Sequence, residues 1–303
     1  MKYFIGTNFS NKEKWIEVSK NEQDALINAH KNLSNAIFIE EKFDIILENF
    51  LEYENDLLTT AWKSLVFFGN EDDFVNIRDL VTRRIINLLS TGSMFGDQCN
   101  RHLRAMNFIT TNEKRDFENY IEKIKQSYLG YRFCLLLRNH ALHIDLPVTS
   151  IVSKFGSEEK NSDKSIFQNR IVPRISIDAL KENKDPELKP IIVDLSNIHG
   201  EVVDLRPLIR EFVLGLSKIN FQIRIATAAQ LGKNEDLILT TLDRLGVDRP
   251  NKSDILYVFQ VNEPNDLFNP HQINLSFLAR RRKYIEKNNL PDTFLNFFAT
   301  NQT

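Results

Sequence analysis

The chain contains few of the residues that interrupt helices, with only 10 Gly and 9 Pro among its 303 residues. This scarcity disfavours a turn-rich β fold and predicts a mainly helical one. Its two cysteines, Cys99 and Cys134, have a spacing that suggests neither a zinc site nor a disulfide framework. No apolar run approaches the roughly 18 residues of a membrane span. The first ten residues lack the apolar centre of a signal peptide, so we expect a cytoplasmic protein.

An excess of charge of either sign is also lacking, since 39 Lys and Arg face 41 Asp and Glu for a formal net charge of −2. Without a global basic field, any affinity for RNA or DNA must come from a local patch. The densest basic run is Arg280-Arg281-Arg282-Lys283. Consecutive helical residues point in different directions around the axis, so we interpret this run as a solvated turn.

The spacing of apolar residues divides the chain into three parts. Residues 1–40 are expected to form a small α/β N-terminal cap. Residues 41–148 carry apolar side chains at three- and four-residue steps, which predicts an up-and-down bundle of long helices. Residues 149–303 are expected to form a smaller mixed α/β C-terminal region of unknown role. The predicted fold class is therefore mainly α.

Local patterns predict the individual elements within these parts. Gly92 and Gly96 lie in the second long helix, where they either bend it or allow a neighbour to approach closely. The expected helices cover residues 22–33, 41–69, 74–106, 114 onward, 128–143, 205–229, 235–245, 275–287 and 294–298. The expected strands cover residues 15–19, 36–39, 171–177, 191–195 and 255–261.

The most informative segment is Arg138-Asn139-His140-Ala141-Leu142-His143, which follows the apolar run Phe133-Cys134-Leu135-Leu136-Leu137. It brings a guanidinium, a carboxamide and two imidazoles to what should be a packed interior. Burying such groups costs several kcal/mol unless each finds a partner. The planar guanidinium of arginine binds a phosphate through two N–H groups at once, and histidine exchanges protons near neutral pH. The segment therefore suggests phosphodiester chemistry.

Helical geometry relates these side chains to one another. At about 100° per residue, Asn139 and His143 are neighbours one turn apart. Arg138 reaches their face only by curling its long side chain, or by serving a site shared with a second helix. Tyr131 is expected to stack beneath Arg138. Three consecutive leucines point in different directions, so the helix should be surrounded, and a second copy of the chain is a natural neighbour.

Arginine, asparagine and histidine suit RNA cleavage because RNA supplies its own nucleophile, the 2′-hydroxyl. A histidine covers the proton transfers, which contribute about 10²–10⁴-fold. An arginine stabilises the charge of the transition state, and an asparagine orients the phosphate or an imidazole. No metal or other cofactor is then required. The expected product carries a 2′,3′-cyclic phosphate.

The longer context of the motif resembles the HEPN superfamily, in particular bacterial HEPN-like proteins with an Arg-x4-His motif. The resemblance covers about residues 40–148 and rests on Asn87-Leu88-Leu89, Asp97, Tyr131-Arg132-Phe133, Leu137-Arg138-Asn139, His143 and Leu146-Pro147. It implies a helical bundle that forms a homodimer with two motifs facing one cleft. Many such proteins are metal-independent endoribonucleases in toxin–antitoxin, abortive-infection or antiviral systems, where a partner protein or antitoxin is common.

By position, the resemblance implies that Arg138 and His143 form the catalytic pair and that Asn139 is the polar residue following the arginine. Asp145 departs from the pattern, because nuclease members paired with nucleotidyltransferases have a tyrosine there. The further candidates for substrate binding are His140, Arg132, Tyr131 and Arg104.

Each of these residues also has a structural interpretation. Arg138 could pair with Asp97 or Asp145, Arg132 could form a salt bridge, and His140 could be an ordinary interior histidine. The favoured hypothesis is an RNA-cleaving enzyme. The alternative is a catalytically inactive HEPN-like module that binds RNA or a protein. A third hypothesis, a metal-dependent hydrolase, would use His140 and His143 as metal ligands.

Overall fold

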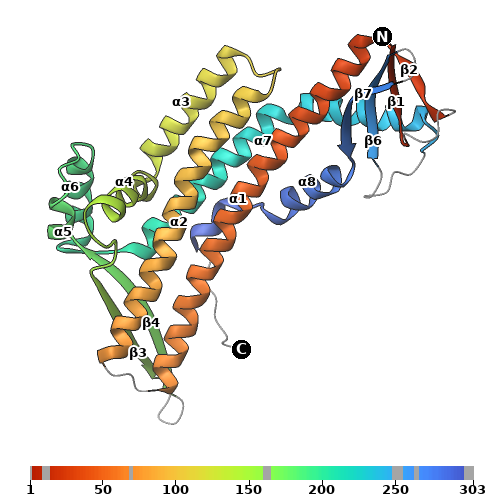
Figure 1. Ribbon diagram of the computed structural model, residues 1–303. Coiled ribbons are helices and arrows are strands. Elements are labelled where there is room, and N and C mark those ends of the chain that lie inside the picture. Colours follow the sequence, from red (N-terminus) through yellow and green to blue (C-terminus); the bar gives the residue numbers. More distant parts are fainter. Residues whose placement is uncertain are drawn as a thin grey trace. The chain divides into compact units, whose positions relative to one another are not determined.

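The computed structural model describes residues 2–8, 14–67, 71–159, 165–247, 255–262 and 266–296. Over these residues the chain is mainly helical with two small antiparallel sheets, which confirms the predicted fold class at that level (Figure 1). The helices are α1 (Lys20–Val66), α2 (Glu71–Ala105), α3 (Thr111–Ser127), α4 (Leu129–His143), α5 (Ile177–Lys181), α6 (Leu188–His199), α7 (Leu205–Arg244), α8 (Ser276–Lys287) and the 3₁₀ helix η2 (Asp292–Asn296). The strands are β1 (Lys2–Gly6), β2 (Ile16–Val18), β3 (Ser150–Glu159), β4 (Ser165–Ser176), β5 (Val202–Asp204), β6 (Ile255–Asn262) and β7 (Asp266–Asn274).

The chain folds into two compact units, each assembled from three separate stretches of sequence. Unit 1 comprises Met1–Lys42, Asp97–Glu118 and Asn220–Asn289. Unit 2 comprises Phe43–Gly96, Asn119–Ile219 and Leu290–Thr303. This division differs from the three consecutive parts expected from the sequence, because α1, α2, α3 and α7 each contribute a segment to both units. The expected cap boundary at residue 40 falls inside the continuous helix α1.

The sheet of unit 1 joins the two ends of the sequence. Its strand order is β2-β1-β6-β7, with every neighbouring pair antiparallel, so Tyr3 lies opposite Gln260. The rings of Trp15 and Phe259 pack edge to face with centroids 4.8 Å apart. The predicted strands at 15–19 and 255–261 are thus confirmed. The strand predicted at 36–39 is wrong, because these residues belong to α1, where apolar residues at helical spacing form its buried face.

Three partly buried histidines lie at helix and strand contacts of unit 1. Nδ1 of His30 in α1 lies 2.9 Å from Nε2 of His271 in β7. Burial, with the nearby His271, lowers the pKa of His30 from 6.5 to about 4. His102 in α2 shares a hydrogen bond of 2.9 Å with Oδ1 of Asn35, and burial beside Lys42 lowers its pKa to about 4. All three rings are therefore neutral at neutral pH, because burial also lowers the pKa of His271.

We expect the free energy of unfolding to fall by about 2 kcal/mol between pH 7 and pH 5 through His30 and His102. The unfolded state binds a proton at each histidine as the pH drops through 6.5, whereas the folded state resists protonation until about pH 4. The contribution of these two neutral histidines to the free energy of unfolding is thus fully present above pH 6.5 and is lost as the pH falls toward 4. Urea titrations of the parent and of a His30→Gln/His102→Gln variant measure this difference. An equal pH slope in both proteins would contradict it.

In unit 2, α7 packs closely against α2 and α4. A Cβ on Gly92 of α2 would lie 2.4 Å from Cζ of Phe212, so the glycine permits a close approach, one of the two roles expected for it. A Cβ on Gly130 of α4 would lie 2.3 Å from the backbone oxygen of Leu208. The start of α7, expected within a separate C-terminal domain, is therefore part of the same core as α2 and α4.

The sheet of unit 2 has the strand order β3-β4-β5, and all its pairs are antiparallel. The strand predicted at 171–177 is confirmed as part of β4. The strand predicted at 191–195 is wrong, because these residues form the middle of α6. A short apolar run does not distinguish a buried strand from a buried helix. Pro190 in the first turn and Gly200 after the last, with φ of 76°, are the local signals for a helix here.

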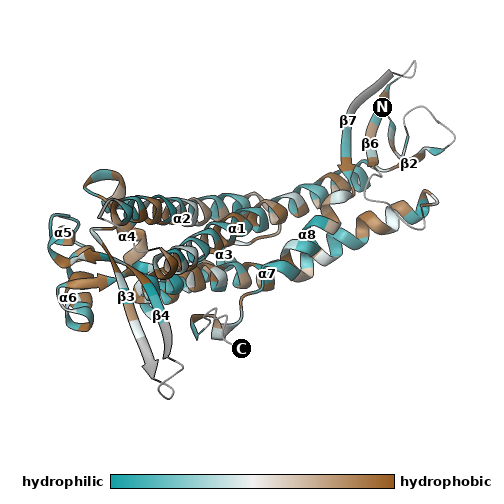
Figure 2. Ribbon diagram, turned by 90° about the horizontal axis from the view of Figure 1, so that it is seen from below, coloured by the Kyte–Doolittle hydropathy of each residue, from teal (hydrophilic) through white to brown (hydrophobic). Residues whose placement is uncertain are grey.

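The helices are amphipathic, and hydrophobic and hydrophilic residues alternate along each ribbon (Figure 2). α3 is an example, because Ile124 is its one fully buried residue among those described and most of its other residues are polar or charged. Within the described ranges, no helix combines the length and the apolar composition that crossing a bilayer requires.

Candidate functional site

The candidate site lies on α4, whose two ends are fixed by backbone hydrogen bonds. The N–H of Gly130 donates to Oε2 of Glu211 in α7 at 2.7 Å. At the other end, the N–H of Ile144 donates to the carbonyl of His140 at 2.9 Å. The helix ends at His143, four residues before Pro147, a residue type that disfavours helical backbone in the residue before it. Arg138, Asn139, His140 and His143 therefore occupy the last two turns.

The buried side of α4 is covered by the same chain. Tyr131, Phe133, Cys134, Leu136 and Leu137 are all buried. The ring of Tyr131 lies 5.7 Å from that of Phe212 in α7, and Sγ of Cys134 donates to the carbonyl of Leu208 at 3.8 Å. α7 thus covers the side of α4 that carries Tyr131 and Cys134. Burial of α4 gives no support of its own to a homodimer.

The accessible side of α4 brings three of the predicted residues into one stripe. Taking Arg138 as zero, Arg132 points at about 120°, Asn139 at about 100° and His143 at about 140°. His143 is exposed, while Arg132 and Asn139 are half-buried. These three side chains therefore share a face about 40° wide that solvent reaches. We call this face the α4 stripe.

The side chain of Arg138 curls toward the α4 stripe, which is one of the two alternatives that the helical geometry allowed. Its Nη1 donates to Oδ1 of Asn139 at 3.1 Å, while its Nε is buried without a partner. Over the described residues, no carboxylate lies within ion-pair distance of Arg138. Asp145 instead accepts the N–H of Leu146 at 2.7 Å. The alternative of a structural ion pair at Arg138 is therefore not observed in this part of the chain.

The two histidines of the motif have opposite environments. His140 is fully buried, and neither of its ring nitrogens has a hydrogen-bond partner. Burial lowers the pKa of His140, against the opposing attraction of Asp145 and Glu182, so the ring is neutral at neutral pH. His143 is exposed in the last turn. Among the described contacts, no hydrogen bond joins Arg138 to His143.

The other substrate-binding candidates are placed in different surroundings. Arg132 has a buried Nε without a partner, and no salt bridge to it is observed within the described ranges. Tyr131 is 4% exposed and packs on α7, so it is a core residue rather than a substrate contact. Arg104 belongs to unit 1, where its Nη2 lies 4.0 Å from Oε1 of Glu118. With Glu118 it borders a groove of about 420 Å³, including the open mouth, whose lining also includes Leu103, Phe117 and Ile223.

The basic run of α8 is engaged in ion pairs rather than simply solvated. Nη2 of Arg280 lies 3.0 Å from Oε1 of Glu41 in α1, and Arg282 pairs with Glu235 in α7. Arg281 between them is half-buried, and burial lowers its pKa. All of these residues belong to unit 1. The run therefore attaches α8 to the long helices.

The structure adds one feature that sequence reasoning missed. Side-chain nitrogens of Arg132, Arg138 and His140 are all buried without partners on a single helix. Of these three residues, only Arg132 belongs to a pattern visible in the sequence, in which Arg132, Asn139 and His143 recur at steps of seven and four residues that place side chains on one face. Over the described residues, no group of three histidines, cysteines or acids is arranged to hold a metal ion.

Comparisons with known proteins identify no relative of this chain. No family model, curated protein or solved structure matches the chain. The likeness to HEPN proteins therefore rests on the motif residues alone, and the function is argued below from the chemistry of the α4 stripe.

Proposed function

We propose that this chain is a metal-independent endoribonuclease and that the α4 stripe binds and cleaves the RNA backbone. The observation that carries the proposal is the environment of Arg138. Its guanidinium bonds to Asn139 and meets no carboxylate among the described residues, and His143 is exposed one turn beyond Asn139. A guanidinium without a counter-charge beside an accessible imidazole suits a phosphodiester.

In the proposed reaction, the imidazole of His143 accepts the proton of the RNA 2′-hydroxyl. The 2′-oxygen then forms a bond to the adjacent phosphorus, while the bond from phosphorus to the 5′-oxygen breaks and that oxygen takes up a proton. Arg138 stabilises the extra negative charge of the phosphorane, and Asn139 holds the guanidinium in place. The products are a 2′,3′-cyclic phosphate end and a 5′-hydroxyl end.

A homodimer belongs to the proposal because two proton transfers occur on opposite sides of the phosphorus. His143 of a second copy would supply the acid for the leaving 5′-oxygen. The support for this pairing is the resemblance to HEPN proteins. A role in toxin–antitoxin or antiviral defence, with a partner protein or antitoxin, is proposed on the same basis, as is a cytoplasmic location.

One observation favours the alternative, a catalytically inactive module that binds RNA or a protein. Within the described residues, Arg138 and His143 are not joined by a hydrogen bond, so the catalytic pair is not assembled in the isolated chain. A module of this kind would use the α4 stripe for binding alone. The same experiment separates the two functions.

The test incubates the purified protein with a mixed RNA pool in EDTA. We expect cleavage that leaves 2′,3′-cyclic phosphate ends, which enzymatic end-group analysis identifies. A matched oligonucleotide with a single 2′-deoxy sugar should resist cleavage at that position because its nucleophile is missing. Binding of RNA without cleavage supports the inactive module. Cleavage that requires an added divalent metal contradicts the proposed mechanism and supports a hydrolase with His140 and His143 as ligands.

A further inference from the structure

The part of α1 that belongs to unit 2 carries an exposed apolar stripe with a regular spacing. Leu51 is 56% exposed, Leu58 is 45% exposed and Trp62 is 53% exposed. Asn55 is exposed as well, and Leu65 is half-buried. We call these five residues the α1 seam. An apolar stripe of this kind on a protein surface marks an interaction site more often than scattered exposed side chains do.

The members of the α1 seam follow one another at steps of four, three, four and three residues, which is the spacing of a heptad repeat. In the notation abcdefg, Leu51, Leu58 and Leu65 take successive d positions. Asn55 and Trp62 take the a positions between them. At about 100° per residue, all five fall within a sector of roughly 80° around the helix axis. The α1 seam is therefore the pattern by which one helix packs along another in a coiled coil.

The chain itself covers a different face of α1. Tyr53, Leu57 and Ala61 are buried and pack into unit 2. These three residues are centred about 120° around the helix from the centre of the α1 seam. The helix thus has two apolar faces in this unit, and one of them is left accessible.

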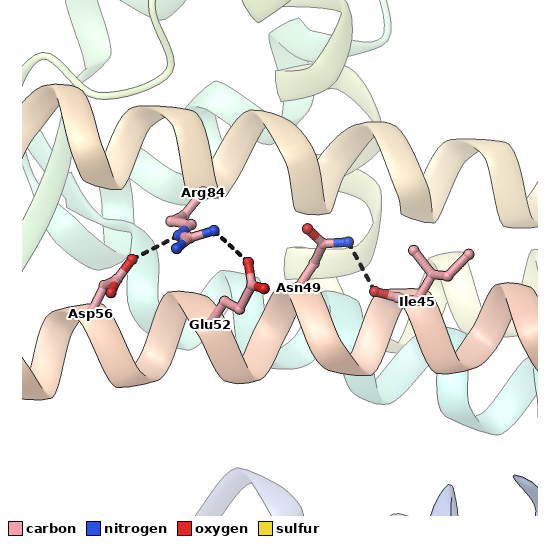
Figure 3. A network of polar contacts seen from close by, with 5 residues as sticks. All are labelled: Ile45, Asn49, Glu52, Asp56 and Arg84. Atoms are coloured by element: carbon pink, nitrogen blue, oxygen red, sulfur yellow. Dashed lines mark hydrogen bonds and ion pairs between the residues drawn. The ribbon is translucent and has the colours of Figure 1, made fainter.

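Acidic residues on both flanks of the α1 seam are neutralised by arginines of the same unit. Figure 3 shows Arg84 of α2, which bonds to Asp56 at 2.6 Å and also pairs with Glu52, on one flank. On the other flank, Arg210 of α7 binds both oxygens of Glu54 at 2.8 and 2.9 Å. The α1 seam itself contains no charged residue. It therefore offers no cation to a nucleic acid, and two copies of it meet without like charges inside the contact.

The length of the α1 seam is limited at both ends. The two preceding positions of the repeat are Asp44 and Glu48, whose charges disfavour the close approach of an identical helix. At the other end, α1 stops at Val66. A contact of 15 helical residues is about 22 Å long, which lies at the small end of specific interfaces. Because α1 is already folded, association does not have to order it, and we expect a dissociation constant on the order of 10 μM.

We propose that the α1 seam is a self-association surface, on which α1 of a second copy lies parallel to that of the first in a short two-stranded coiled coil. Asn55 determines both the partner and the direction. In a parallel pair each a position faces the same position of the partner, so two Asn55 amides hydrogen bond to each other. In an antiparallel pair an a position faces a d position, and Asn55 would lose water against Leu58 without gaining a hydrogen bond. An identical helix supplies the matching amide at the required level.

This surface is separate from the pairing of α4 helices that the proposed function requires. The α1 seam and the α4 stripe lie on different helices and share no residue. The α1 seam alone gives a dimer with two-fold symmetry. A chain that used both surfaces would assemble beyond a dimer, because each surface is self-complementary and each recruits a different copy.

Cross-linking through a single cysteine tests the α1 seam directly. In a parallel pair, the cysteines of two Leu51→Cys chains would face each other at the roughly 5–6 Å Cα separation of a disulfide. Cys99 and Cys134 are both buried, so the native thiols contribute little background. Under mild oxidation we expect a disulfide-linked dimer of Leu51→Cys. Ile198→Cys is the matched control and should stay monomeric, because Ile198 is exposed at 65% in the same unit but lies on α6.

Sedimentation of the full chain without RNA measures the strength of association. Leu58→Lys places like charges across the α1 seam and is expected to weaken association by about 10-fold or more. Asn55→Leu removes the polar restriction, so association should tighten about 10-fold and species larger than a dimer should appear. Both positions are exposed, so circular dichroism should show an unchanged fold. Ile198→Lys is the matched control and should associate as the parent protein does.

The outcomes separate the α1 seam from the proposed function. A parent protein that is still monomeric at about 100 μM overturns the α1 seam. Equal cross-linking of Leu51→Cys and Ile198→Cys also overturns it, as does preferential cross-linking of Leu51→Cys to Trp62→Cys chains, which would show an antiparallel pair. A dimer that persists unchanged in Leu58→Lys overturns the α1 seam and leaves the α4 pairing in place. Cross-linked Leu51→Cys dimers of a protein that cleaves no RNA uphold the α1 seam and contradict the nuclease.

Discussion

Replacing His143 or Arg138 with alanine is expected to reduce RNA cleavage by about 10²–10⁴-fold each. His143→Ala removes the group that accepts the 2′-hydroxyl proton. Arg138→Ala removes the cation beside the phosphorane. Initial rates on a fluorogenic RNA in EDTA measure both effects. Because the two groups act in one transition state, the cleavage rate of the double variant should be only slightly lower than that of the slower single variant.

The fold should tolerate both changes, which makes the result interpretable. His143 is exposed, and the side-chain hydrogen bond of Arg138 is with the neutral Asn139, so no ion pair of Arg138 is lost among the described residues. His199→Ala, in the last turn of α6, and Arg83→Ala, exposed on α2, are matched controls in the same unit and should cleave RNA at the parent rate. If both motif variants cleaved RNA at the rate of the parent protein, the residues of α4 would not take part in the reaction.

The geometry of the motif was predictable to the extent that one helix determines it. The spacing of Arg138, Asn139 and His143 left two possibilities, a curled arginine or a site shared with a second helix, and Nη1 of Arg138 bonds to Asn139. The environments of the two histidines were not predictable, because they depend on other elements. Burial of His140 and exposure of His143 follow from which side of α4 the rest of unit 2 covers.

Helices were predicted better than strands because their apolar period extends over many residues. α7 is instructive, since the sequence predicted two helices separated near Gly232, whereas a single helix runs from Leu205 to Arg244. Leu231, Ile238 and Leu242 are fully buried, so one apolar face continues past the glycine and outweighs its helix-breaking tendency. Tertiary packing therefore keeps α7 continuous at a position where the local helix propensity is low.

Contacts between distant parts of the sequence could not be predicted at all. No local pattern shows that β1 pairs with β6, whose residues are more than 250 positions away. The same holds for Glu40 of α1 and Arg224 of α7, which are 184 residues apart. These long-range contacts assemble unit 1 from separate stretches, and they explain why boundaries drawn along the sequence at residues 40 and 148 miss the actual units.

The Glu40–Arg224 pair gives the second large effect that we expect, a loss of about 3–5 kcal/mol in unfolding free energy for Glu40→Ala. Arg224 donates to both oxygens of Glu40, at 2.8 and 2.6 Å, and Asn220 donates to one of them at 3.3 Å. The side chains are 4% and 13% exposed, so the surviving guanidinium would remain buried without its counter-charge. Half-buried Arg281, which also feels the charge of Glu40, would lose an attraction.

Urea unfolding measures this loss, and the neighbouring residue provides the control. Glu41 pairs with Arg280 at 3.0 Å, but both side chains are accessible, so Glu41→Ala should cost less than about 1 kcal/mol. Replacing both partners, as Glu40→Leu/Arg224→Leu, should regain part of the stability because no buried charge is then left alone. Equal losses for Glu40→Ala and Glu41→Ala would mean that burial does not set the energy of this pair. A double variant less stable than Glu40→Ala would show that the ion pair itself, rather than the penalty of an orphaned charge, holds α1 and α7 together in unit 1.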